Sequence, residues 1–73
     1  KREAIMAKSF NSREIKRRLE AEGWTLNRTK GDHNQFRHPT LPGLVTLAHP
    51  SKDIPIGTLR SIFRQAGWEW PPK

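Results

Sequence analysis

Residues 24–38, WTLNRTKGDHNQFRH, decide the fold. In the first half, Trp24 and Leu26 alternate with polar residues, which predicts a half-buried strand. Gly31 then marks a tight reversal, because glycine accepts the positive φ that hairpin turns require. In the second half Phe36 is the one large apolar residue, which predicts a second strand with one buried face. We therefore interpret the segment as a β-hairpin.

A third strand and two helices are predicted around this hairpin. Asn11 and Glu14 have the spacing of a capping box, in which Asn11 accepts from an orphan amide and Glu14 reaches back to the Asn11 amide. Pro55 suits the first position of a second helix, and Gly23 and Gly67 are placed as left-handed stops. The predicted elements are a helix over about 12–22, strands over about 24–29, 33–38 and 44–49, and a helix over about 55–66.

The order of these elements predicts an α+β fold, α-β-β-β-α. Three antiparallel strands would offer one face to two helices and leave the other face to solvent. We expect one domain over residues 10–70, a flexible leader over 1–9 and a tail over 71–73. Met6 is a candidate for the native start.

The composition restricts the classes of function. The chain has 73 residues, 14 Lys and Arg against 7 Asp and Glu, and no cysteine. A second core, a disulfide framework and a Cys-based zinc site are therefore excluded. No apolar run approaches the roughly 20 residues of a membrane span. We expect a cytoplasmic domain whose net charge of +7 favours a polyanionic partner.

The parity of the second strand predicts a chemical site on the open face. If Phe36 points to the helices, His33 points to solvent. Neutral imidazole can take a proton from a ribose 2′-hydroxyl, and imidazolium can return one to a leaving oxygen. Nearby side chains would hold the phosphates of RNA and complete the predicted site. These RNA-binding candidates are Arg28, Lys30, Gln35, Arg37 and Lys52.

Several of these residues have a plain structural interpretation as well. An exposed histidine in a basic protein is often ordinary surface, and Trp70 either stacks on a base or docks the C-terminal tail. His33, His38 and His49 lack the spacing of a metal site, so we expect no metal. Asp32 either orients an imidazole or serves the turn. The parity of His38 and His49 favours structural or edge positions.

Four segments together resemble the HicA toxin family. They are GW (residues 23–24), KGDHNQFRHP (30–39), VTLAHP (45–50) and IGTLRSIFRQAG (56–67). The resemblance runs from about Ser12 to Trp68. A G-x-H-x-x-F segment paired with a downstream G-T-L-R-S-I helix is far more specific than either piece alone.

The resemblance implies a fold like the double-stranded-RNA-binding domain and a metal-independent ribonuclease that cleaves mRNA without a cofactor. It implies neutralisation by a HicB-type antitoxin and a catalytic role for His33. Many members have G-S-H-H here, whereas this chain has Asp32 and Asn34 beside His33. The first alternative is a non-catalytic RNA-binding module that reads A-form shape. A pure protein-interaction subunit is the second alternative.

Overall fold

The computed structural model describes residues 10–72. The predicted leader and the last residue of the predicted tail lie outside this range. The described elements are helix α2 (Ser12–Ala21), strands β1 (Thr25–Lys30), β2 (His33–Arg37) and β3 (Leu44–Ala48), and helix α3 (Ile56–Ala66). Their order confirms the predicted α+β fold, and the helix and strand ends differ from the prediction by at most one residue.

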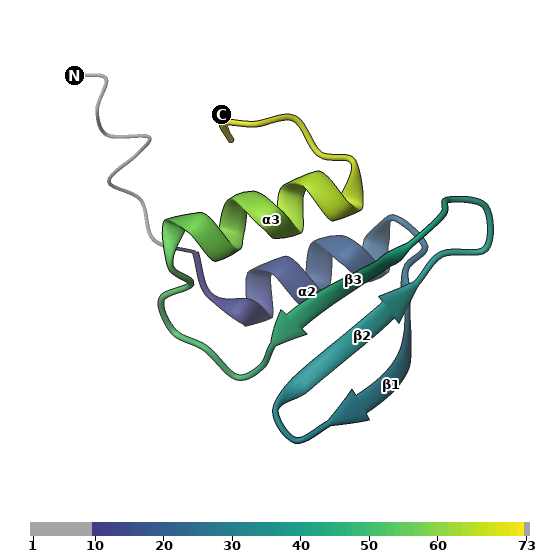
Figure 1. Cartoon of the computed structure of the whole chain (residues 1–73), viewed down its shortest axis with the longest axis horizontal. Coiled ribbons are helices and arrows are strands. Elements are labelled where there is room, and N and C mark those ends of the chain that lie inside the picture. Colours follow the sequence, from purple (N-terminus) through teal and green to yellow (C-terminus); the bar gives the residue numbers. More distant parts are fainter. Residues whose placement is uncertain (1–9, 73) are drawn as a thin grey trace.

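The strands form one antiparallel sheet in the order β1-β2-β3, with β2 in the centre. Helices α2 and α3 lie side by side and cover the same side of this sheet (Figure 1). The covered face contributes Phe36, Val45 and Leu47 to the core, each no more than 1% exposed. Leu19 and Phe63 meet them from the helices and are equally buried. Within residues 10–72, no helix covers the other face of the sheet.

The prediction of a half-buried first strand was wrong for Leu26. All six residues of β1 are exposed, and Leu26 keeps 50% of its surface open. The physical reason is that β1 lies at the edge of the sheet, beyond the helices, which pack mainly against β3 (Figure 1). Trp24 is buried as expected, at 1% exposure, but it precedes the strand.

A β-bulge changes which way the second half of β1 faces. Leu26 pairs with Phe36 and Arg28 pairs with Gln35, so that Asn27 is an extra residue without a partner in the register. An extra residue reverses the alternation of the residues that follow it. Strict alternation would put Arg28 on the same face as Leu26. The bulge instead places Arg28 with Gln35 on the open face.

Both helix ends follow the predicted caps, with two corrections. The Asn11 side chain accepts from the Glu14 amide at 2.8 Å, but residues 10–72 show no return contact from the Glu14 carboxylate. Pro55 is the N-cap of α3 rather than its first helical residue. Gly23 and Gly67 have φ of +98° and +78°, as expected for left-handed stops.

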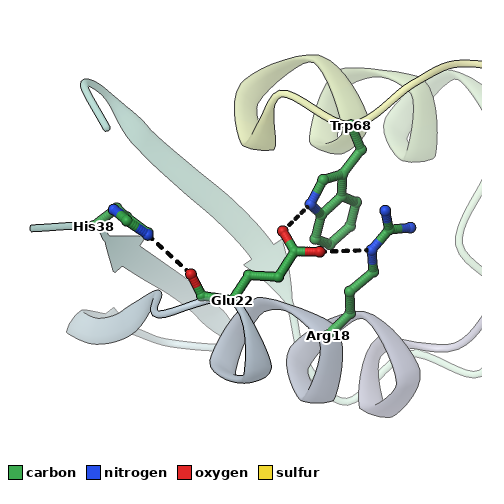
Figure 2. Close-up of polar contacts among 4 residues, drawn as sticks. All are labelled: Arg18, Glu22, His38 and Trp68. Atoms are coloured by element: carbon green, nitrogen blue, oxygen red, sulfur yellow. Dashed lines mark hydrogen bonds and ion pairs between the residues drawn. The ribbon is translucent and has the colours of Figure 1, made fainter. Parts of the chain in front are cut away.

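One group of side chains, the Glu22 cluster, fastens the ends of α2, α3 and β2 together (Figure 2). The Glu22 carboxylate accepts from Arg18 Nε at 3.2 Å and from Trp68 Nε1 at 2.7 Å. Its backbone carbonyl lies 2.9 Å from His38 Nε2. The Arg18 guanidinium lies 4.0 Å from the centroid of the Trp68 ring, within cation–π range. We define the cluster as Arg18, Glu22, His38 and Trp68.

Candidate nucleic-acid interface

His33 opens strand β2 and stands on the uncovered face of the sheet. Its side chain is 63% exposed. Its neighbours alternate as predicted, because Asn34 and Phe36 are buried whereas Arg37 is exposed. In the register His33 lies opposite Lys30 on one side and Ala48 on the other. The imidazole is therefore accessible at the exit of the hairpin turn.

A hollow of about 330 Å³ surrounds this imidazole on the open face. Register pairs Arg28 with Gln35 and Lys30 with His33, so the bulge in β1 is what brings both cations to the hollow. No carboxylate of residues 10–72 is among the lining side chains. We call this site the basic hollow and define it by Arg28, Lys30, His33, Gln35 and Thr46.

Asp32 lies next to the imidazole and can orient it. Its Oδ1 is 3.4 Å from His33 Nδ1, a long contact between two exposed groups. The Asp32 backbone is held more firmly, because its carbonyl accepts from the His49 amide at 2.8 Å. A proton on Nδ1 that faces the carboxylate leaves Nε2 as the basic nitrogen. Asp32 thus serves the turn with its backbone and faces the imidazole with its side chain.

Two predicted RNA-binding residues lie outside the basic hollow. Arg37 shares the open face but sits four residues along β2 from His33, roughly 13 Å away at strand spacing. It lines a separate hollow with Leu41 and Leu44. Lys52 follows β3 and lines a third hollow, with Ser12 and His49. The structure therefore brings together Arg28, Lys30 and Gln35 around His33, and separates Arg37 and Lys52 from it.

The other two histidines are tied into the fold. His38 Nδ1 accepts from the amides of Thr40 and Leu41 at 3.1 and 3.2 Å, and its ring packs edge-on against Trp24 with centroids 5.2 Å apart. This acceptor role at Nδ1 makes Nε2 the donor to the Glu22 carbonyl. These contacts give His38 a structural role.

His49 pairs with Ser12, whose Oγ lies 2.7 Å from Nδ1. Serine and histidine at this distance resemble an activated nucleophile. Ser12, however, is only 1% exposed, and its Oγ also accepts from the Ser51 amide at 2.8 Å. Its backbone amide donates to the Ser51 carbonyl at 2.8 Å as well. The pair therefore fastens the start of α2 to the loop after β3.

Trp70 packs against the core instead of standing free. Its ring meets Phe63 edge-on, with centroids 5.3 Å apart. Of the two interpretations of this residue, tail docking is the one that the contacts favour.

Sequence reasoning missed Thr46 and a second depression beside His33. Thr46 lies opposite Gln35 in the register, and its parity between the buried Val45 and Leu47 could have placed it on the open face. The second depression has a volume of about 400 Å³ and lies between β3 and α3. Only the packing of α3 on β3 creates it, so no local pattern signals it.

Neither a metal site nor a membrane span is found within residues 10–72. This part of the chain contains no group of three or more His, Asp or Glu residues that could hold a metal ion. None of its helices is long and apolar enough to cross a membrane.

The fold and the basic hollow define a small α+β domain of the double-stranded-RNA-binding-domain type, with a cationic open sheet face. The chain belongs to the HicA toxin family: the model of the HicA toxin of bacterial toxin–antitoxin systems matches residues 12–68. It is therefore the toxin of a toxin–antitoxin pair. The comparison with curated proteins finds no match.

Proposed function

We propose that this toxin is a metal-independent endoribonuclease that cleaves mRNA in the cytoplasm, with His33 as its general acid and base. The observation that carries the proposal is the exposed imidazole of His33 inside a hollow that also holds Arg28 and Lys30. Family membership supports the toxin role, and the hollow supports the chemistry.

The reaction requires one proton transfer in each direction. Nε2 of His33 accepts the proton of a ribose 2′-hydroxyl, and the 2′-oxygen attacks the adjacent phosphorus. The bond from phosphorus to the 5′-oxygen breaks, and the leaving oxygen takes a proton from the imidazolium or from water exchanging with it. The products are a 2′,3′-cyclic phosphate and a free 5′-hydroxyl. The imidazole returns to its starting state.

The cations of the basic hollow would bind the substrate and stabilise the transition state. Negative charge grows on the phosphate oxygens as the 2′-oxygen attacks, and fixed cations are most effective where charge develops. Arg28 and Lys30 belong to the edge strand β1 and line the basic hollow, where that phosphate would sit. Gln35 adds a polar contact, and Arg37 extends the cationic face along β2.

An antitoxin of the HicB type would silence the enzyme by covering this open face. A partner seated over the uncovered sheet would bury His33 and exclude RNA. A complex in which His33 stays open to solvent would require a different mode of inhibition.

The test compares the chain with its His33→Ala variant on labelled single-stranded RNA. General acid–base catalysis is typically worth about 10²–10⁴-fold, so the cleavage rate should fall by that factor. Thermal unfolding and RNA affinity should stay nearly unchanged, because the side chain is exposed. EDTA should not alter the rate of the unmodified chain.

Two outcomes would contradict the proposal. Cleavage retained by well-folded His33→Ala protein would remove His33 from the chemistry. RNA that is bound but not cut by the unmodified chain would favour the non-catalytic RNA-binding module.

A further inference from the structure

We propose that the depression between β3 and α3, the α3 groove, is a nucleobase subsite for the nucleotide next to the cleaved phosphate. This inference rests on the proposed function, because it adds a specificity site beside the same histidine. His33 and Thr46 line both the α3 groove and the basic hollow. A nucleotide whose sugar and phosphate lie at His33 can therefore place its base in the α3 groove.

The α3 groove has an apolar floor and a polar rim. Leu47, Ile54 and Ile62 line it, and each is at least nine-tenths buried. Thr58, Ser61 and Gln65 follow one another at intervals of three and four residues, so they lie along one face of α3. A concave, mainly apolar surface with a few convergent polar groups is the usual character of a small-ligand site. A nucleobase combines a flat apolar body with a polar edge.

The volume and charge of the α3 groove also suit a base. Its volume of about 400 Å³ lies within the range of small-molecule sites. Among residues 10–72 no carboxylate lines it, so it does not repel the phosphates on either side of a bound base. The basic hollow continues from it along the sheet, which provides a path for the backbone of the RNA.

Gln65 is the residue best placed to read the edge of the base. Its Oε1 accepts from the Thr46 backbone amide at 3.1 Å, across from α3 to β3. This bond determines which end of the side-chain amide is oxygen. The NH₂ group therefore keeps two donors for acceptors on a base.

Ser61 supplies a hydrogen-bond acceptor, which complements the donors of Gln65. Its hydroxyl donates to the Gly57 carbonyl at 3.2 Å. The lone pairs of its oxygen remain available to accept from an amino group of a base. A donor at Gln65 and an acceptor at Ser61, one turn apart, can distinguish bases by the pattern on their edges.

The first experiment is a titration of the isotope-labelled chain with 2′-O-methyl pentanucleotides, followed by amide NMR. The 2′-O-methyl group removes the nucleophile, so these probes bind without being cut. We expect shifts at Thr46, Thr58, Ser61 and Gln65 in addition to those at Lys30 and His33. The sizes of the shifts in the α3 groove should depend on the base sequence.

The outcomes separate this inference from the proposed function. Shifts confined to the basic hollow, together with His33-dependent cleavage, would overturn the subsite and leave the ribonuclease intact. No shift at either place and no cleavage would overturn both. If the α3 groove responds only to an added HicB-type antitoxin, it is a protein-docking surface and the inference is wrong.

The second experiment fills the α3 groove. Ser61→Leu should lower kcat/KM for an oligonucleotide about ten-fold or more, because the leucine side chain would occupy the space that the base needs in the α3 groove. Ala21→Leu adds the same apolar side chain to an exposed position on α2 and serves as the matched control. Equal activity of the two variants, with equal thermal unfolding, would overturn the inference.

The third experiment changes base preference without filling the groove. Gln65→Glu keeps the acceptor for the Thr46 amide and removes both donors. Its effect is measured as the ratio of kcat/KM between oligonucleotides that differ in one base. The added negative charge cancels in that ratio, because the substrates carry equal charge. We expect the ratio to change by about five-fold or more, and an unchanged ratio at every position would contradict the inference.

Discussion

The two ends of strand β2 carry the same side chain in opposite circumstances. His33 at the start is 63% exposed, and its Nδ1 lies 3.4 Å from Oδ1 of Asp32. His38, just after the end, is held by the Glu22 carbonyl, two backbone amides and the Trp24 ring. His38 follows His33 by five positions, an odd interval, which favours opposite sides of the sheet for the two side chains.

The difference shows that residue type alone does not identify the candidate catalytic histidine. At the end of β2 that His38 follows, which we call the closed end, both nitrogens of the His38 ring are hydrogen-bonded to the backbone, and the imidazole has a structural role. We call the end that carries His33 the open end. At the start of β2 the His33 side chain lines the basic hollow, and within residues 10–72 only its Nδ1 has a polar partner, Asp32. Mutations at the His38 end should change the free energy of unfolding, whereas mutations at the His33 end should change the rate of RNA cleavage.

The largest effect on the closed end should come from Trp68→Ala. Trp68 is 8% exposed, donates to Glu22 and packs edge-on against Phe63. We expect a loss of about 3–5 kcal/mol in the free energy of unfolding, measured by urea denaturation. If this variant fails to fold, Trp68→Phe removes the indole donor while keeping an aromatic ring, and it should cost about 1 kcal/mol or more. No loss in either variant would mean that the Glu22 cluster does not hold the closed end.

His38→Ala should cost about 2 kcal/mol of unfolding free energy, because hydrogen bonds and the ring contact with Trp24 are lost together. Cleavage per folded molecule should stay at the level of the unmodified chain. His33→Ala is the matched variant at the start of β2 and should change the unfolding free energy by less than about 0.5 kcal/mol. Loss of cleavage by stable His38→Ala protein would break the comparison, since it would give both histidines a chemical role.

Arg28→Gln tests whether the cations of the basic hollow, at the end of β2 that carries His33, bind the phosphates of RNA. Loss of one phosphate contact should weaken binding to single-stranded RNA and reduce the slope of log K against log salt by about 0.7. Arg17→Gln removes the same charge from the exposed surface of α2 and should leave the slope nearly unchanged. The measurement is a binding titration with 2′-O-methyl RNA at several salt concentrations. Equal slopes for the two variants would show that charge as such, and not the basic hollow, attracts RNA.

The smallest effect is expected from Asp32→Asn. If the carboxylate orients His33, kcat should fall by about five-fold while KM stays constant, because a single polar contact is worth about 1 kcal/mol. Asp32→Glu should recover part of the loss, which a role confined to the turn would not do. Unchanged kcat in Asp32→Asn would assign the side chain to the turn alone.

Much of the fold could be predicted because its signals are local. The capping residue Asn11, the stops Gly23 and Gly67 and the apolar stripe of α3 act through neighbours within one or two turns. The parity around Phe36 likewise placed His33 on the open face. The same reasoning was wrong for Leu26, because coverage of β1 depends on how far the helices reach across the sheet.

Sequence by itself determined the order of the elements, the exposed face of β2 and the exposure of His33. Tertiary structure decided which cations join it, since the bulge at Asn27 brings Arg28 to the basic hollow whereas Lys52 lies elsewhere. It also created the α3 groove. The physical reason is one of range: caps, turns and periodicity act between near neighbours in the chain. Register, edge coverage and grooves arise only when distant segments pack.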